Sequence, residues 1–400
     1  MSGRTVLFIG YWGVDDALTV STILPGVRTL LADPRVGRVI LATVERRAFT
    51  GAALKGIERL EHRPIIASRL RPAALARALD LRRQVRTLRR LVRDEQVSLV
   101  FARTSFAGAL AHFATRGSGV PYVVESFEPH ADYMRDCGVW SAHGPFYRVG
   151  RYLDRLPLGT AAFLLPVAAN YGNELVRQGF PADRIRVVPC PVDTRRFAFD
   201  PAARVRVRGE LGLGDDLVGI YAGKFGGLYH REHAFASFAR AHHHTAGRLR
   251  LVVLTPEPAA TVLQGLEAAG FPTDRAYVRF VAHDDVPAHL SAADLAFATY
   301  RRTPSSAFLS PIKNGEYWAS GLPVLLTRGV ADDSAIIQRE PEGGAVFDPA
   351  GDDLGPALDH VLALLREPGQ RQRTALMAAR HRAMAITEHA YADVLGTLWG

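Results

Sequence analysis

Residues Leu217–Glu232 read LVGIYAGKFGGLYHRE, and this stretch indicates the class of fold. Leu217–Ala222 is an apolar run with the length of a buried strand. Gly223–Gly227 is a glycine-rich turn that contains Lys224, and we expect a helix to begin near Tyr229–Glu232. A strand followed by a glycine turn and a helix lets backbone N–H groups approach a phosphate. The loop equally fits a plain tight turn, because it matches neither the dinucleotide-binding nor the P-loop pattern.

The same alternation of apolar runs and helical stretches extends along all 400 residues. In the first half the expected strands are Thr5–Ile9, Arg38–Ala42, Val97–Ala102, Pro121–Glu125, Ala162–Pro166 and Ile185–Pro189. In the second half they are Leu217–Ala222, Leu249–Leu254, Tyr277–Val281, Asp294–Ala298, Pro323–Thr327 and Ala345–Phe347. Strands that alternate with helices predict βαβ units and a parallel sheet. Two such series predict an α/β protein with two doubly wound, Rossmann-like domains, joined by the proline-rich segment Pro189–Pro201.

The composition is that of an ordinary globular protein, with 48% hydrophobic and 22% charged residues. Cys137 and Cys190 lie far apart and form no CxxC pair, so we predict neither a metal site nor disulfides and expect a reducing cytoplasm. The longest apolar runs, such as Ala161–Ala169, are too short to span a bilayer. The N-terminal Thr5–Ile9 is typical of a first strand and not of a signal peptide.

A net charge of +9 is concentrated in Arg69–Arg93, which holds nine arginines and one acidic residue, Asp80. Leucine and valine recur there at roughly helical spacing, so we predict a basic amphipathic helix within Pro72–Gln96. This helix fits a solvated surface, and it also fits peripheral contact with an anionic membrane at its inner face. It does not favour nucleic acid, because no aromatic residues interleave the arginines.

The segment Ser310–Val324 reads SPIKNGEYWASGLPV and predicts a short helix that leads into a strand. Ser310 suits the N-cap and Pro311 the first helical position, while Gly321 marks the end. Lys313 in the first turn opposes the helix dipole, and an interior glycine, Gly315, weakens the helix. Residues that weaken a helix without a visible benefit favour a functional site. Here Lys313 would supply a cation for an anionic ligand, and Gly315 would let that ligand approach the backbone. The alternative is a solvent-facing helix in which Lys313 and Glu316 form a local ion pair.

Several segments together resemble family 4 glycosyltransferases. Glu316–Val324 (EYWASGLPV) resembles the donor-site pattern E-A-M-A-C-G-x-P-V, and Ser310–Glu316 resembles its S-P-x-K-x-x-E variant. Val187–Phe197 (VVPCPVDTRRF) resembles the V-x-P-N-G-V-D-x-x-x-F linker, and Gly223–Tyr229 resembles the family's glycine-rich loop. The matches keep the family's order and cover much of residues 185–350.

The resemblance implies a GT-B fold, in which two Rossmann-like lobes face a central cleft, and a retaining, metal-independent transfer of sugar. The implied domains are 1–195 on the acceptor side, 196–375 on the donor side, and a helix 376–400 that crosses back. No cofactor is implied, because the nucleotide sugar, a UDP-, GDP- or dTDP-sugar, is a substrate. The sequence does not identify the sugar-containing acceptor; the basic helix makes a lipid-linked acceptor, or a cell-envelope glycan of polysaccharide biosynthesis, an option.

The resemblance also implies roles for individual residues at the donor. Glu316 would bind the nucleotide ribose, and Lys224 and Lys313 would neutralise the diphosphate. The remaining residues that we place around the donor are Gly223, Gly226, Gly227, Arg231 and Ser310. One departure stands out: Phe308 occupies the position where many members carry a second glutamate that contacts the sugar.

Two loops of the first lobe are candidates for the acceptor and the chemistry. After strand Thr5–Ile9 come Tyr11, Trp12 and Asp15, and the two aromatic rings could stack on a sugar or pack into the core. After strand Pro121–Glu125 come Glu128 and His130; family members often place a histidine here, near the transferred sugar. His130 is therefore our first catalytic candidate, with Glu128 second and Lys224 stabilising the leaving group.

Two other functions fit the same fold. A nucleotide-sugar 2-epimerase would consume a nucleotide sugar without an acceptor. A non-catalytic glycan-binding or scaffolding protein is favoured by Phe308, but Lys224, Lys313 and Glu316 argue against it, because a scaffold needs no diphosphate site.

Overall fold

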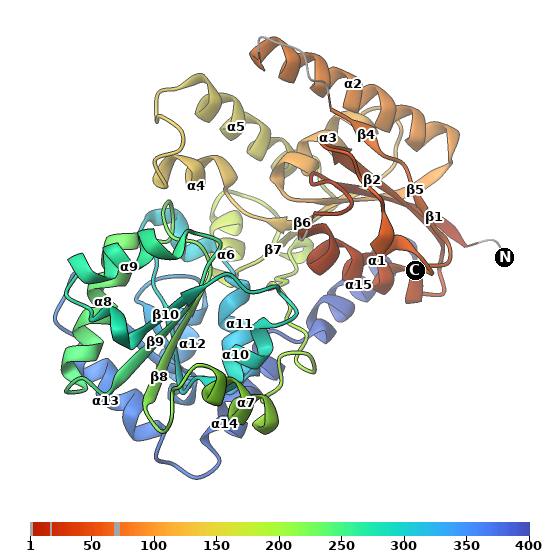
Figure 1. Ribbon diagram of the computed structural model, residues 1–400. Helices are drawn as coiled ribbons and strands as arrows, with labels where there is room; N and C mark the ends of the chain where they lie inside the picture. Colours follow the sequence, from red (N-terminus) through yellow and green to blue (C-terminus); the bar gives the residue numbers. More distant parts are fainter. Residues whose placement is uncertain (1–2, 17, 68–72) are drawn as a thin grey trace. The chain divides into compact units, whose positions relative to one another are not determined.

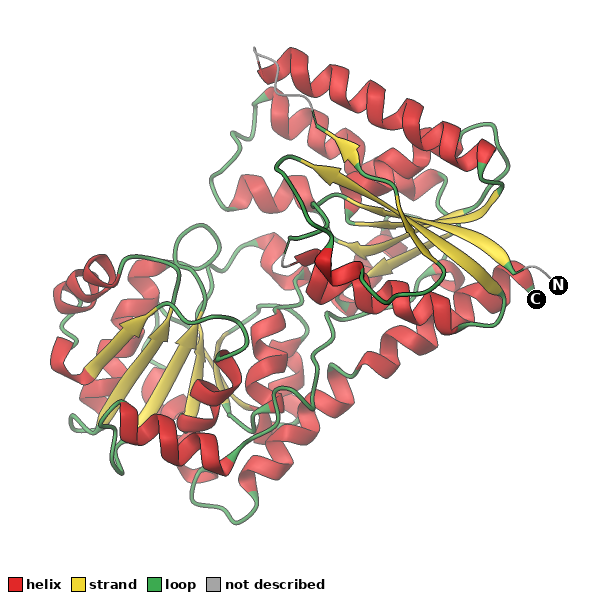
Figure 2. Cartoon of the chain, turned by 45° about the vertical axis from the view of Figure 1, so that its right-hand side comes forward, coloured by secondary structure: helices red, strands yellow, loops and turns green. Residues whose placement is uncertain are grey.

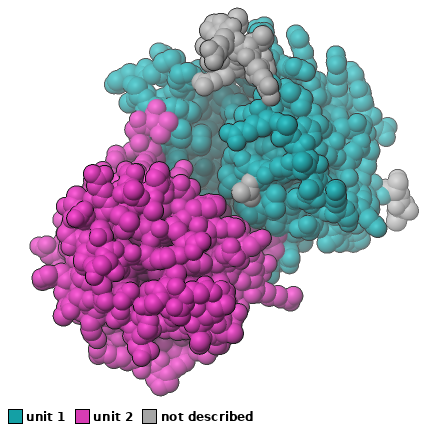
Figure 3. Space-filling model, viewed as in Figure 1, with its two compact units in different colours: residues 1–135, 140–190, 385–400 teal, residues 136–139, 191–384 magenta. Residues whose placement is uncertain are grey.

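The computed structural model describes residues 3–16, 18–67 and 73–400 (Figure 1). The chain divides into two compact units, which Figure 3 shows in different colours. Unit 1 comprises Met1–Arg135, Trp140–Cys190 and Ala385–Gly400, and unit 2 comprises Asp136–Val139 and Pro191–Met384. No helix among the described residues is long and apolar enough to cross a membrane.

Unit 1 contains a parallel sheet with the strand order β3-β2-β1-β5-β6-β7, and β4 pairs with the far end of β2. Its strands are β1 (Arg4–Gly10), β2 (Val36–Glu45), β3 (Leu60–His62), β4 (Ile65–Ile66), β5 (Val97–Arg103), β6 (Tyr122–Phe127) and β7 (Phe163–Pro166). The longer strands are nearly all apolar because helices cover both faces of the sheet, as Figure 2 shows.

The helices of unit 1 form one layer on each face of this sheet. They are α1 (Leu24–Ala32), α2 (Ala73–Asp94), α3 (Ser105–Thr115), α4 (His130–Asp136), α5 (Pro145–Arg155), α6 (Ala169–Arg177) and α15 (Met384–Trp399). A π-helix, Thr19–Ile23, precedes α1, and the 3-10 turns are Ala52–Leu54, Leu156–Gly159 and Ala182–Arg184. Helices α1 and α15 share a hydrophobic core with one face of β1, β2 and β5. On the other face α3 lies between α2 and α5 (Figure 1).

Unit 2 contains a second parallel sheet, with the order β10-β9-β8-β11-β12-β13. Its strands are β8 (Leu217–Ala222), β9 (Leu249–Leu254), β10 (Ala276–Arg279), β11 (Leu295–Ala298), β12 (Val324–Thr327) and β13 (Gly344–Phe347). Its helices are α7 (Pro201–Glu210), α8 (Arg231–His244), α9 (Ala259–Ala268), α10 (Val286–Ala292), α11 (Ile312–Ala319), α12 (Asp333–Arg339), α13 (Leu354–Leu364) and α14 (Gln370–His381). The 3-10 turns are Thr273–Arg275, Pro304–Phe308 and Pro341–Gly343.

Each sheet has a point where the chain reverses the direction in which it adds strands. In unit 1 this point lies between β1 and β5, and in unit 2 it lies between β8 and β11. Open parallel sheets bind ligands beyond the carboxyl ends of the two strands at this point, because the loops there diverge and leave a crevice. The fold therefore predicts ligand sites at the loops that follow β1 and β5 in unit 1 and at those that follow β8 and β11 in unit 2.

The α/β class and the doubly wound pattern predicted from sequence are confirmed, and eleven of the twelve expected strands are found within a residue or a few. The expected strand Ile185–Pro189 is wrong. This segment runs extended beside β7, and Arg186 and Val188 donate backbone hydrogen bonds to it. It forms only a single bridge, between Leu164 and Ile185, because Pro189 and Pro191 have no N–H to continue a ladder.

Candidate functional site

The loops at the switch point of unit 2 are joined to each other. Gly226 and Tyr229 exchange backbone hydrogen bonds of 2.6 and 3.0 Å, which closes the loop after β8 into a tight turn. Gly226 and Gly227 have positive φ angles of 89° and 58°, so the turn needs residues without a side chain. The Arg301 N–H, after β11, donates to the Leu228 carbonyl at 2.6 Å. The two loops therefore form one surface at the carboxyl edge of the sheet.

Glu257, which follows β9, anchors the glycine loop from the other side. Its carboxylate accepts a hydrogen bond from the Phe225 N–H at 2.6 Å and pairs with the Arg231 guanidinium. The charge of Arg231 is thus largely offset within the protein. Lys224, by contrast, is exposed at the tip of the loop. Of the two basic side chains on this side of the site, Lys224 and Arg231, Lys224 has the charge that can meet an anion.

Helix α11 begins one residue later than the sequence predicts. Pro311 has an extended ψ of 116° and is the N-cap itself, so the expected N-cap Ser310 lies outside the helix. The Ser310 hydroxyl instead accepts a hydrogen bond from the Arg382 guanidinium. The Tyr317 hydroxyl accepts a hydrogen bond of 2.8 Å from the Ala222 N–H, which fixes α11 against the end of β8. Lys313 and Glu316 are therefore held beside the glycine loop.

The Lys313 ammonium nitrogen is enclosed by aromatic rings. It lies 4.4 Å from the ring centre of Tyr221, 4.2 Å from that of Tyr229 and 5.6 Å from that of Tyr300. The nitrogen is buried and has no hydrogen-bond acceptor among the described residues. Burial lowers the pKa of Lys313 to about 7, with a smaller lowering from Lys224, and Glu316 opposes both. A buried cation without an acceptor is a group that an anionic ligand would stabilise.

Glu316 lies one turn after Lys313 on the same helix. Burial raises the pKa of its carboxyl to about 7, and the positive charges of Lys313 and Arg196 oppose this rise. The carboxyl is therefore held partly desolvated beside a partly desolvated amine. Such a pair can accept hydrogen bonds from hydroxyl groups through Glu316 and neutralise an anion through Lys313.

A buried polar network positions α11 from behind. Asp333 and Arg382 are 0% and 2% exposed, and they form an ion pair. The Asn314 amide donates to the other oxygen of Asp333 at 2.8 Å. The Arg382 carbonyl accepts a hydrogen bond of 2.9 Å from the Val192 N–H. Helices α11, α12 and α14 and the chain after Pro191 are thereby locked together.

Gly315 belongs to this packing and not to a ligand surface. A β-carbon at Gly315 would lie 3.1 Å from Cγ of Arg382 and 3.4 Å from Cβ of Val192. The sequence-based expectation that Gly315 lets a ligand approach the backbone is therefore wrong. The glycine is needed because Arg382 and Val192 pack directly on this side of the helix.

Two carboxylates, the buried Glu45 and the exposed Asp15, hold the loop after β1 in unit 1. Glu45 accepts a hydrogen bond of 2.9 Å from the Val14 N–H, and Asp15 accepts from the N–H groups of Thr50 and Gly51. The backbone hydrogen bond from Thr50 keeps the pKa of Asp15 below its usual range. Asp15 thus has an evident role in joining two loops.

The two aromatic residues of this loop have different surroundings. The Tyr11 ring lies between the Arg46 guanidinium, 4.3 Å from the ring centre, and Phe106, at 4.4 Å between centres. Phe106 follows β5, so Tyr11 joins the two loops at the switch point of unit 1. Trp12 is partly buried against the hydrophobic core. Both rings keep some exposed surface.

His130 opens α4 and lies in an acidic environment. Its Nδ1 is 3.9 Å from the Glu128 carboxylate. Burial alone would lower the pKa of His130, but Glu128 and Asp154 outweigh it and raise the pKa above the usual value. Burial raises the pKa of Asp154 to about 7, although Asp154 accepts a hydrogen bond of 2.7 Å from the Ala131 N–H. The carboxylates around His130 therefore favour its protonated form.

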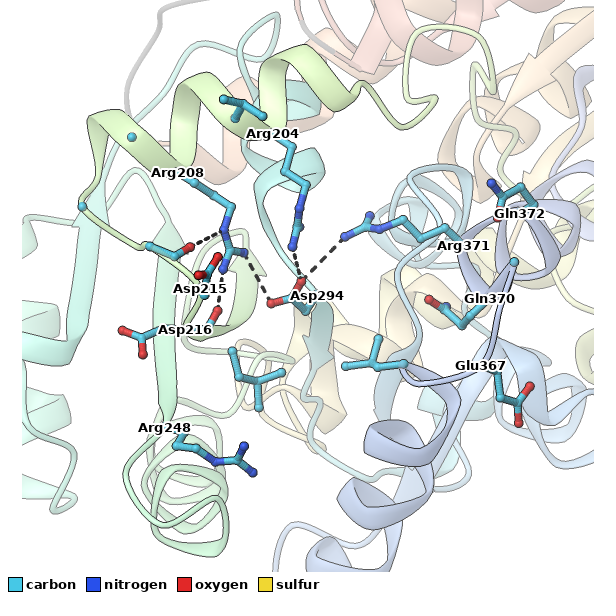
Figure 4. Close-up of a pocket in the computed structure, with 17 residues that line it drawn as sticks. Arg204, Arg208, Asp215, Asp216, Arg248, Asp294, Glu367, Gln370, Arg371 and Gln372 are labelled. Carbon is cyan, nitrogen blue, oxygen red and sulfur yellow. Dashed lines mark hydrogen bonds and ion pairs between the residues drawn. The ribbon is translucent and has the colours of Figure 1, made fainter.

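A cavity of about 1170 Å³ lies at the opposite end of the sheet of unit 2 (Figure 4). Its lining includes Leu217, the first residue of β8, and Asp294, the residue directly before β11. Arg204, Arg208 and Arg371 also line it. All three guanidinium groups point at Asp294, at 2.7, 3.4 and 3.9 Å, and they also donate to backbone carbonyls. The arginines are thus engaged within the protein, and the cavity lies away from the carboxyl ends where ligands of this fold bind.

Known proteins share this architecture. Residues 38–191 match the family model of the glycosyl transferase 4-like domain. Among solved structures, sucrose-phosphate synthase from Thermosynechococcus elongatus matches with a TM-score of 0.75 at 13% identity over 99% of both chains. HepE from Anabaena, solved in a complex with UDP, matches with a TM-score of 0.68 at 13% identity over 98% of this chain and 100% of its own. The chain therefore has the GT-B fold, and its residues 38–191 match a glycosyl transferase 4-like domain.

WaaG, a glycosyltransferase of lipopolysaccharide biosynthesis, matches with a TM-score of 0.69 at 15% identity over 98% of this chain and 100% of its own. No curated protein sequence matches this chain. At these identities the solved structures establish the GT-B fold, and the family model describes residues 38–191 as a glycosyl transferase 4-like domain.

In this structure, Gly223, Lys224, Lys313 and Glu316 are brought together at the switch point of unit 2. The groups that support them are Glu257, Asp333, Arg382 and the tyrosines around Lys313, and sequence reasoning missed them all. The sequence indicates these two carboxylates only weakly. Glu257 comes shortly after the expected strand Leu249–Leu254, and Asp333 is the first residue of α12. Phe308 lies at the end of the 3-10 turn Pro304–Phe308.

Proposed function

We propose that this protein is a glycosyltransferase and that it takes its sugar from a nucleotide-diphosphate sugar, which binds to the Gly223–Tyr229 loop and to α11. The observation that carries the proposal is the buried, acceptor-free Lys313 ammonium at the switch point, beside the exposed Lys224. A diphosphate placed between them would give each lysine a charge-assisted hydrogen bond, worth about 1.5–3 kcal/mol. Backbone N–H groups of the loop would contribute further donors.

The nucleotide end of the donor would lie toward Glu316. Its carboxyl would accept hydrogen bonds from the ribose hydroxyls, and this interaction favours the ionised form of Glu316. Gly226, Gly227 and Ser310 would border the nucleotide. Because Arg231 pairs with Glu257, we assign it to holding the loop, with at most an indirect effect on the diphosphate.

Transfer with retention of configuration and without a metal ion fits the charges at this site. The transition state develops negative charge on the leaving diphosphate, and Lys224 and Lys313 supply fixed positive charge there. The donor phosphate would then take the proton of the acceptor hydroxyl. His130 is the proposed catalytic group on unit 1, where Glu128 and Asp154 raise its pKa and so favour its charged form, with Glu128 as its partner.

The proposed acceptor is a sugar-containing molecule, and a lipid-linked or cell-envelope glycan is the class to test first. Tyr11 and Trp12 follow β1 at the switch point of unit 1, and their partly exposed rings can stack on a sugar. Asp15 would act by holding this loop in place through Thr50 and Gly51.

A thermal-shift screen tests the donor class. The protein is heated with UDP, GDP, dTDP and ADP and with their sugars, in a buffer that contains a chelator. Ligand at about 100 times its dissociation constant should add about 2.7 kcal/mol of stability. A selective shift with one nucleotide supports the proposal, and UDP-glucose is the first sugar to try because HepE was solved with it. No shift with any nucleotide would contradict it.

A second assay distinguishes transfer from the two alternatives, a nucleotide-sugar 2-epimerase and a glycan-binding protein. Incubation with the selected nucleotide sugar alone should leave it unchanged apart from slow hydrolysis. Conversion of the sugar to its 2-epimer would instead identify an epimerase. Binding without turnover in the presence of a broad set of glycan acceptors would favour a glycan-binding role.

A further inference from the structure

Helix α5 of unit 1 has a firmly packed inner face. Tyr147 and Leu153 are buried, and the helix crosses Trp140 at Gly150, where a β-carbon would lie 2.6 Å from the indole ring. Asp154 also points inward and accepts the Ala131 N–H. The helix therefore cannot turn about its axis to bury its remaining side chains.

The outer face of α5 presents large apolar side chains to solvent. Phe146, Val149 and Tyr152 are 51%, 57% and 60% exposed. They are spaced three residues apart, so they lie along one side of the helix. Single exposed apolar residues are common on protein surfaces, but a row of three on one helix marks an interaction surface.

Arginines run beside this apolar row. Arg148, Arg151 and Arg155 are exposed, and none of them has an ion pair with another residue in the described part of the chain. Arg148 lies one turn from Tyr152, so the basic and apolar stripes are adjacent. An apolar stripe bordered by arginines is the pattern of a helix that lies in a membrane interface.

Helix α2 extends the basic surface on the same side of unit 1. Both α2 and α5 pack against α3, and Figures 1 and 2 show all three above the same face of the sheet. The exposed arginines of α2 are Arg82, Arg83, Arg86, Arg89, Arg90 and Arg93. Arg69 and Arg71, which the sequence also places in this basic segment, lie outside the described residues. Leu79 on α2 is a further exposed apolar side chain.

We infer that unit 1 docks on an anionic lipid bilayer through the outer face of α5, with the arginines of α2 contacting lipid headgroups beside it. The apolar row would enter the boundary between headgroups and acyl chains, and the arginines would pair with lipid phosphates. A free phosphate would leave Val149 and Tyr152 in water, and a second copy of this face would bring arginines against arginines. The charge and the apolar row together therefore fit a bilayer best.

Vesicle sedimentation with the full chain tests this inference. The protein should sediment with vesicles of phosphatidylcholine and phosphatidylglycerol and stay in solution with phosphatidylcholine alone. Arg148→Gln/Arg151→Gln and Val149→Ser/Tyr152→Ser should each weaken binding about tenfold or more. Circular dichroism melts of both variants should match the parent protein, because all four side chains are exposed.

Helix α7 of unit 2 offers a matched control, since Val205 is 75% exposed and Arg206 is exposed beside it. Val205→Ser/Arg206→Gln removes the same kinds of side chain and should leave vesicle binding unchanged. Failure of the parent protein to bind anionic vesicles would overturn the inference, as would equal binding by the α5 variants. Binding of an acidic protein or of nucleic acid in place of vesicles would do the same. The assay involves no nucleotide sugar, so its outcome is independent of the proposed transfer reaction.

Discussion

The Lys313 ammonium lies directly against the backbone of Gly223, so that a β-carbon on Gly223 would be 2.8 Å from the nitrogen. This contact joins the first turn of α11 to the glycine loop. It also explains why residue 223 has no side chain, beyond its φ of 141°.

Gly223→Ala should therefore weaken nucleotide binding by displacing Lys313. We expect a loss of about 1–3 kcal/mol of stability from the backbone strain, and a loss of affinity of about tenfold. Gly270→Ala is the matched control, because Gly270 also has a positive φ, of 84°, but open space where the β-carbon would lie. Isothermal titration with the nucleotide should show the loss only for Gly223→Ala; equal affinities for both variants would mean that the contact does not matter.

The affinity for a nucleotide sugar should fall as the pH rises above about 7. Burial lowers the pKa of Lys313 to about 7, so its ammonium is fully charged only below this pH. A diphosphate binds the charged form, and the loss should approach about tenfold per pH unit. A nucleotide sugar is the suitable probe because its diphosphate does not titrate near neutrality.

Titrations of Lys313→Met over the same pH range should give weak, nearly constant affinity. Glu316→Gln separates the effect of the second group, since burial also raises the pKa of Glu316 to about 7. That variant should keep the decline with pH. If the affinity still declined with pH in Lys313→Met and no longer declined in Glu316→Gln, the pH dependence would come from Glu316, and the prediction for Lys313 would be contradicted.

The Asp333–Arg382 pair should be strongly coupled in stability. Arg382→Met leaves a buried carboxylate without its partner, which costs about 3–5 kcal/mol, and Asp333→Asn leaves a buried guanidinium. The double variant should be more stable than the sum of the two losses predicts. Urea unfolding of the four proteins gives the coupling free energy. Arg206→Met, which breaks an exposed pair with Glu210, should cost less than about 1 kcal/mol; a similar loss at both sites would count against the buried network.

Glu257 should control the glycine loop through two separate contacts. Glu257→Gln keeps an oxygen for the Phe225 N–H but loses the ion pair with Arg231, whereas Glu257→Ala loses both. Nucleotide affinity should therefore fall further in the alanine variant than in the glutamine variant. Glu267→Ala, at an exposed position on α9, should have no effect. Equal affinities for both Glu257 variants would show that the loop does not depend on this anchor.

Much of the fold could be read from the sequence because most strands are buried on both faces. Leu217–Ala222 and Leu249–Leu254 are uninterrupted apolar runs, and β8 and β9 have these same bounds. Strand β3, Leu60–His62, could not be found in this way, because its three residues are half-buried and mostly polar. Its strand geometry comes from pairing with β2, the preceding strand, and no pattern within its own three residues shows this pairing.

The residues of the candidate site also differ in whether the local sequence indicates their role. Lys313, Glu316 and Gly223 could be picked out because a charge or a glycine in an unusual place is visible locally. The roles of Gly315 and Ser310 were misjudged because both depend on Arg382, which is about 70 residues further along the chain. No local pattern reveals that a distant arginine packs on a helix.

Binding of the nucleotide diphosphate should require both lysines, and isothermal titration of the parent protein, Lys224→Met and Lys313→Met would show this. Each ligand is tested as the nucleoside diphosphate and as the free nucleoside. We predict that each substitution weakens diphosphate binding by about tenfold or more and leaves the weak nucleoside binding unchanged. Unchanged diphosphate affinity in both variants would contradict the assignment of the diphosphate to the Gly223–Tyr229 loop and α11.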